Sequence, residues 1–114
     1  MALSLETDYH VGSKDVTISI VIGDAQLGAS VLKIDSKEIK RGDKIQNLKI
    51  GKESQLKGKT LSIKTVVTDV NDKTNHTSVT YKLKGGTKDN DFYLDATVDN
   101  EGDSVIYRAK FNFV

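Results

Sequence analysis

Apolar and polar residues alternate along most of the chain. The clearest example is the segment VTISIVI at 16–22, where every second residue is valine or isoleucine. Because successive side chains of a β-strand point to opposite faces of the sheet, a period of two predicts a strand with one buried face. Similar alternation marks seven further segments: 3–11, 31–34, 44–50, 61–67, 79–83, 92–98 and 105–113.

This pattern predicts an all-β protein. No segment carries a sustained apolar stripe at helical spacing, and only two single helical turns are expected, near residues 36–40 and 52–57. About seven to nine short strands, separated by turns rich in Gly, Asp, Asn and Lys, favour an antiparallel β-sandwich. We expect residues 1–114 to form it as a single domain. A closed β-barrel is the alternative, because the alternation is the same in both architectures.

The spacing of the strands resembles that of immunoglobulin-like and C2-like sandwiches. This resemblance implies an architecture and no particular function. The apolar sides of the strands are expected to meet in one interior. Its predicted members include Ile18, Ile20, Ile63, Tyr81, Leu94 and Phe111.

The last two strands are predicted to form a hairpin around the loop NEGD at 100–103. In this register Val98 lies opposite Val105 and Phe92 opposite Phe111, so that the apolar residues share one face. On the other face, two polar pairs are expected: Asp95 with Arg108, and Tyr93 with Lys110.

Composition excludes several kinds of chemistry. The 114 residues contain no cysteine, which rules out disulfides, a thiolate zinc site and a thiol nucleophile.

The N-terminal MALSLETDYH lacks the basic start and apolar core of a signal peptide. No apolar run approaches the roughly 18 residues of a membrane span. We therefore expect a cytoplasmic protein, one exported by a route without such a signal, or a piece of a larger protein.

Charge is nearly balanced overall but uneven along the chain. The net charge of +1 argues against a nucleic-acid partner. Residues 33–64 hold ten Lys/Arg and four Asp/Glu, whereas residues 89–103 hold six acids and no Lys or Arg. The candidate interaction residues are Lys57 and Lys59 in the basic segment, and Asp89 and Asp91 in the acidic one. Either folding mixes these charges over the surface, or it creates a polarised surface suited to association of identical chains.

Three valines lie on the polar side of their strands. If Val21, Val31 and Val66 are brought together, they form an exposed apolar patch of the kind that marks partner surfaces. The alternative is that a loop or the N-terminal segment covers them.

The polar stretch TDVNDKTNHTS at 68–78 is a candidate calcium site, because calcium prefers oxygen ligands. A second acidic loop, DNEGD at 99–103, could share the ion if both loops lie at one end of the sandwich. The candidate ligands are Asp69, Asn71, Asp72, Asp99, Glu101 and Asp103. Turn chemistry is the competing explanation, since Asp and Asn gather in loops without any ligand. His76 could bind a transition metal together with His10, or simply be solvated.

No constellation of residues indicates catalysis. Neither histidine lies in a nucleophile motif, and the acids lack the aromatic cleft that holds a sugar. We therefore expect a non-enzymatic module for protein–protein interaction or self-assembly, acting through strand edges, the valines, or the oppositely charged segments. A loop-end module that binds calcium or a carbohydrate is the alternative. Apart from calcium, no cofactor is expected.

Overall fold

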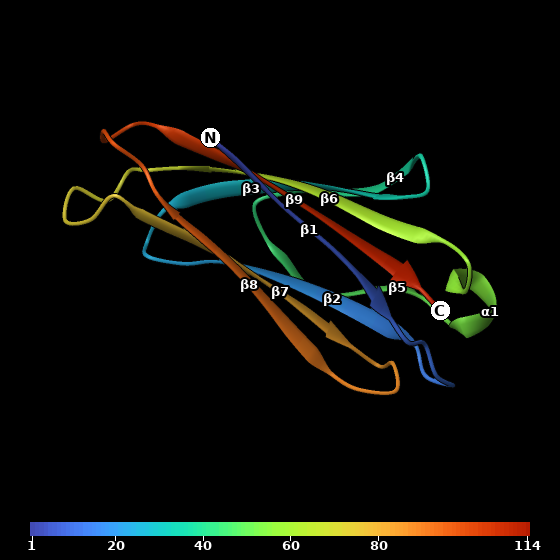
Figure 1. Cartoon of the computed structure of the whole chain (residues 1–114). Coiled ribbons are helices and arrows are strands. Elements are labelled where there is room, and N and C mark those ends of the chain that lie inside the picture. Colours follow the sequence, from blue (N-terminus) through green and yellow to red (C-terminus); the bar gives the residue numbers. More distant parts are fainter.

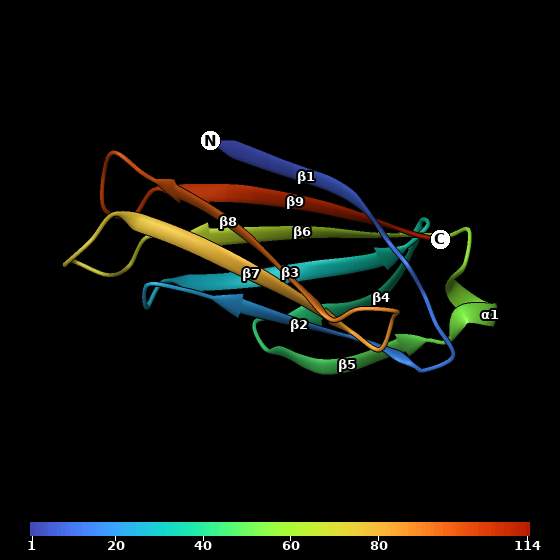
Figure 2. The same ribbon diagram turned by 60° about the horizontal axis from the view of Figure 1, so that its bottom comes forward.

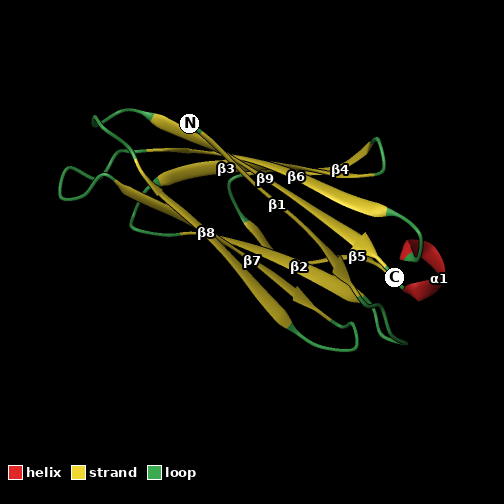
Figure 3. Cartoon of the chain, in the orientation of Figure 1, coloured by secondary structure: helices red, strands yellow, loops and turns green.

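The computed structural model describes all 114 residues and consists of nine strands and one helical turn (Figures 1 and 3). The strands are β1 (Ala2–Tyr9), β2 (Val16–Ile22), β3 (Leu27–Ile34), β4 (Lys37–Gly42), β5 (Ile45–Gly51), β6 (Thr60–Thr68), β7 (His76–Lys84), β8 (Asn90–Thr97) and β9 (Ser104–Phe113). The helical turn α1 (Glu53–Leu56) connects β5 to β6.

The strands form two sheets packed face to face. One sheet has five strands in the order β1-β9-β6-β3-β4, and the other has four in the order β5-β2-β7-β8 (Figure 2). Neither sheet closes on itself, so the predicted β-sandwich is confirmed and the barrel alternative is wrong. All pairings are antiparallel except one, in which β1 runs parallel to β9 from Ala2–Ile106 to Tyr9–Phe113.

The interior lies between the two sheets, as the alternation predicts. Twenty buried apolar residues from both sheets and their connections form one cluster. Five of the six predicted members belong to it, and the sixth, Leu94, is partly buried against it. Phe111 is central, because its ring lies 6.1 Å from that of Tyr81 and 5.0 Å from that of Phe92. The predicted interior is therefore confirmed.

The predicted hairpin between β8 and β9 is wrong. These strands belong to different sheets: Val105 pairs with Val67 of β6, while the Val98 N–H donates to the Asn75 carbonyl. The expected polar pairs also fail, since Arg108 lies opposite Lys64. The apolar residues of β8 and β9 do face each other, but across the interior, as the Phe92–Phe111 ring contact shows. Alternation alone does not distinguish neighbours within a sheet from neighbours between sheets.

Of the two helical turns predicted from the sequence, the structure contains one. The helical turn expected near 52–57 is confirmed by α1. The one expected near 36–40 is wrong, because Asp35 takes a positive φ of 53° and turns the chain directly from β3 into β4. Ile39 of β4 then packs against the core. The helical turn falls far short of the length needed to cross a membrane.

Three connections meet at one end of the elongated molecule, which measures 45 × 24 × 21 Å. They are the β2–β3, β6–β7 and β8–β9 loops, at the left in Figure 1, while α1 lies at the other end. The Gln26 side chain joins the first two loops by donating to the Thr74 and His76 carbonyls and accepting from the Val70 and Asn71 N–H groups. We call this end the loop end.

Candidate functional site

The outer side of the five-stranded sheet gathers positive charge. Strand pairing places Arg41 opposite Val31, Val31 opposite Lys64, and Lys64 opposite Arg108, in one row across four strands. The next row contributes two more cations. We call this surface the basic face; its members are Lys33, Arg41, Lys64, Arg108 and Lys110. All five line one shallow hollow of about 390 Å³.

Most of this charge is not neutralised within the molecule. Arg41 alone has a carboxylate within 4.0 Å, because its Nη2 lies 2.6 Å from Oε1 of Glu38. That hydrogen bond lowers the pKa of Glu38 and raises the pKa of Arg41. The other four cations form no salt bridge. Two acids share these rows, since Glu6 lies opposite Lys110 and Glu38 opposite Lys33. Five cations against two acids still leave the basic face with a net positive charge.

One pair on this face is unfavourable for folding. Lys64 and Arg108 are exposed and directly opposite each other on adjacent antiparallel strands. Like charges in this position destabilise a sheet, whereas opposite charges stabilise it. A local arrangement that opposes stability is typical of a surface kept for function.

Sequence reasoning missed the basic face as a unit. Three of its cations come from the predicted basic segment 33–64, but Arg108 and Lys110 come from β9. The polar parity of each strand shows that these side chains point outward. Only the pairing of β6 with β9 shows that they meet, whereas the alternation pattern predicts that β9 pairs with β8.

The predicted patch of three valines divides between the two sheets. Val31 and Val66 lie on the basic face, where they line a second hollow of about 340 Å³ beside Lys64. Val21 belongs to β2, in the other sheet, and is 46% exposed. The three are therefore not one surface, although all remain accessible in part.

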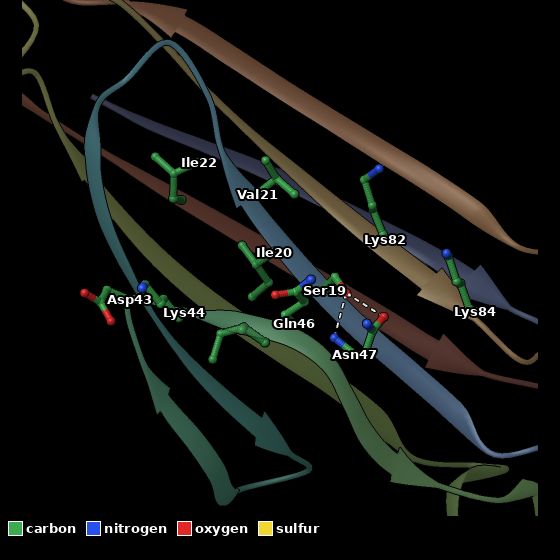
Figure 4. Close-up of a pocket in the computed structure, with 11 residues that line it drawn as sticks. Ser19, Ile20, Val21, Ile22, Asp43, Lys44, Gln46, Asn47, Lys82 and Lys84 are labelled. Atoms are coloured by element: carbon green, nitrogen blue, oxygen red, sulfur yellow. Dashed lines mark hydrogen bonds between the residues drawn. The ribbon is translucent and has the colours of Figure 1, made fainter.

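Val21 lines the largest hollow of the structure, about 640 Å³ between β2, β5 and β7 (Figure 4). It forms where β5 bulges: Asn47 takes a positive φ of 49°, and its N–H donates to Ser19 Oγ at 2.8 Å. Pairing of β2 with β5 ends at Ile20, so Val21 and Ile22 pair with β7 only. The hollow has mixed charge, because Asp43 lies among its lysines and Lys82 is paired with Asp91 at 3.8 Å.

The two predicted calcium loops do lie together at the loop end. The Asp69 N–H donates to the Asp103 carbonyl, and the Gly102 N–H donates to the Asp69 carbonyl. No three acidic or histidine side chains, however, are grouped so that they could hold a metal ion. Asp69 is fully buried with both carboxylate oxygens unpartnered, whereas Asp72, Asp99 and Asp103 are exposed. Calcium binding stays a prediction.

His76 is held between two carboxylates at the loop end. Its Nδ1 lies 2.9 Å from Asp24 Oδ2, and its Nε2 lies 2.8 Å from Asp95 Oδ2. The hydrogen bond with Asp95, and then the charge of Asp24, raise the pKa of His76 above its ordinary value. His10 lies at the opposite end, where its carbonyl accepts the Thr87 N–H. The two histidines therefore do not share a metal site.

The predicted acidic segment divides along β8. Asp89 and Asp91 lie near the hairpin to β7, where Asp89 Oδ1 accepts the Gly85 N–H and Asp91 pairs with a lysine. Residues 99–103 lie at the loop end. Lys57 and Lys59 follow α1, at the end of the molecule opposite the loop end. Folding thus separates charges that are close in sequence.

The chain matches no protein-family model, no curated protein and no solved structure.

Proposed function

We propose that this protein is a non-catalytic interaction module that docks an acidic protein segment on its basic face. The single observation that supports this role is the gathering of five cations around one hollow, four of them in no salt bridge. Opposite charge on a partner steers association and sets its register. The accessible valines Val31 and Val66 add apolar contact beside the charges.

The shape of the surface favours a protein segment as the ligand. The hollow is open and lies on the broad side of a sheet, unlike the enclosed cavities that bind small molecules. Its cations stand in two rows across four strands, so an extended or looped chain with several carboxylates can contact several of them together.

An octaglutamate peptide tests the proposal. We expect it to bind in low salt and to shift the amide resonances of β6 and β9, with about tenfold weaker binding when NaCl is raised from about 20 to 300 mM, because salt screens exposed charges. The Lys64→Gln/Arg108→Gln variant should weaken binding about tenfold or more. Lys14→Gln/Lys88→Gln, which removes the same charge from exposed loops, should bind as the wild type does.

Two outcomes would contradict the proposal: the peptide fails to bind, or it binds both double variants equally. If the peptide fails and a DNA duplex of equal charge binds the basic face, the surface is assigned to phosphate recognition.

A further inference from the structure

We infer that the acidic segment is supplied by a second copy of this chain, whose loop end docks on the basic face. This inference rests on the proposed function and names its partner. It starts from a second charged surface, which we call the acidic tip. Its members are Asp72, Asp99, Glu101 and Asp103, all exposed at the loop end.

The acidic tip is complementary to the basic face in charge. The tip carries four carboxylates and the basic face five cations, one of which is already paired with Glu38. No carboxylate of the tip forms a salt bridge with a cation of its own copy. The residues of the β8–β9 loop, 99–103, include three acids and no Lys or Arg. Lys73, which directly follows Asp72, is also exposed, so the tip keeps an excess of three negative charges. Both surfaces thus carry charge that forms no salt bridge within the monomer.

The acidic tip is already ordered for docking. The Asp103 N–H donates to the Asn100 carbonyl, and the Asn100 N–H donates to Asp103 Oδ2. The Gly102 N–H and the Asp69 N–H tie the same loop to the β6–β7 loop. A loop fixed by its own hydrogen bonds loses little conformational entropy on binding.

The geometry makes the contact head-to-tail. The tip lies at the end of the long axis, whereas the basic face lies on a broad side (Figure 1). The two surfaces differ, so each copy in a pair keeps one of them unused and can bind a further copy. A loop tip on a shallow hollow buries less than the roughly 1,200 Å² of a stable interface. Association should therefore be weak and visible at high protein concentration.

The test is sedimentation equilibrium at millimolar protein in about 20 and 300 mM NaCl. We expect the wild type to form a concentration-dependent series of oligomers, with association about tenfold weaker at the higher salt. The face variant Lys64→Gln/Arg108→Gln and the tip variant Asp99→Asn/Glu101→Gln should each be about tenfold weaker. The control variants Lys14→Gln/Lys88→Gln and Asp43→Asn/Glu53→Gln should assemble like the wild type.

Mixing the two variants gives the sharpest result. The intact tip of the face variant can dock on the intact face of the tip variant, while the remaining surfaces are neutralised. We therefore expect 1:1 dimers at wild-type affinity and no larger species. Melting temperatures of each variant confirm that the fold is retained.

Two results would overturn the inference. A wild type that is monomeric at both salt concentrations excludes self-assembly, and if octaglutamate still binds, the proposed function survives with a different partner. Oligomers that persist in both variants place the contact elsewhere on the molecule. Failure of octaglutamate to bind while the mixed dimers form would contradict the proposed docking of acidic segments in general, and would support a contact specific to the folded loop of a second copy.

Discussion

The buried carboxylate of Asp69 is the least satisfied group in the molecule. It is fully buried, and neither oxygen has a hydrogen-bond partner. Burying a polar group without a partner is costly, and more so for a charged one. The Asp69→Asn variant keeps the shape and removes the charge, so we expect its free energy of unfolding to rise by about 1 kcal/mol. Urea unfolding at pH 7 measures the change.

A calcium ion bound to Asp69 would reverse the expected effect of the Asp69→Asn substitution. If an ion neutralises the carboxylate in solution, Asp69→Asn should instead lose stability, and millimolar calcium should raise the melting temperature of the wild type but not that of the variant. The melting curves of both proteins, with calcium and with chelator, separate the two explanations.

His76 makes stability depend on pH. Its two carboxylate contacts raise its pKa above the ordinary 6.5, so the folded protein keeps a proton that the unfolded chain has lost. This contribution is complete below pH 6.5 and is lost as pH rises through the folded pKa. We expect the free energy of unfolding to fall from pH 6 to 8. His76→Gln should flatten this slope, and equal slopes in the two proteins would contradict a contribution from the contacts of His76 with Asp24 and Asp95.

Two buried threonines, Thr65 and Thr77, could not be predicted from the sequence. Thr65 and Thr77 occupy inward positions, where alternation alone favours apolar side chains. They are completely buried because Thr65 bonds the hydroxyl of Tyr81 and Thr77 that of Tyr107, each across the two sheets. Burial raises the pKa of Tyr81 to about 12. Such partners, far apart in the chain, become visible only once the sheets are assigned.

At the scale of elements, the pairing of β6 with β9 brings two like charges together, which should lower the stability of the fold and strengthen the binding of an acidic partner. Lys64→Glu places an acid opposite Arg108, so we expect the free energy of unfolding to rise by about 0.2–1 kcal/mol. The same change should weaken octaglutamate binding. Lys14→Glu, in an exposed loop, should do neither. Urea unfolding and peptide titration of the two variants test this, and a less stable Lys64→Glu protein would show that the like-charge pair carries no penalty.

The sequence was most informative about faces and least informative about neighbours. The parity of Val105, Tyr107 and Phe111 correctly predicted which side of β9 is buried. The parity could not identify the neighbours of β9. An apolar face can pack against another strand of the same sheet or against the opposite sheet across the interior, and the pattern is the same in both cases. The parallel pairing of β1 was equally hidden, since it joins the two ends of the chain. The basic face and the acidic tip depend on these pairings, and so only their separate residues could be found.

At the scale of the whole molecule, folding creates a charge asymmetry that the net charge of +1 conceals. Three cations of the segment 33–64 join two of β9 on a broad side, while the acids of residues 99–103 lie at the narrow loop end. Positive and negative charges from different segments of the chain thus lie on two different surfaces of the folded molecule. If head-to-tail docking holds, this asymmetry also sets a direction for growth of the assembly.

The parallel pairing of β1 with β9 has a mechanical consequence. The chain begins at the loop end of β1 and leaves β9 near α1, so the two terminal strands lie side by side with their free ends pointing in opposite directions (Figure 1). A stretching force applied to both ends would load all the hydrogen bonds between these strands at once, in shear, instead of peeling them apart one by one. The fold is therefore suited to carrying tension along its long axis.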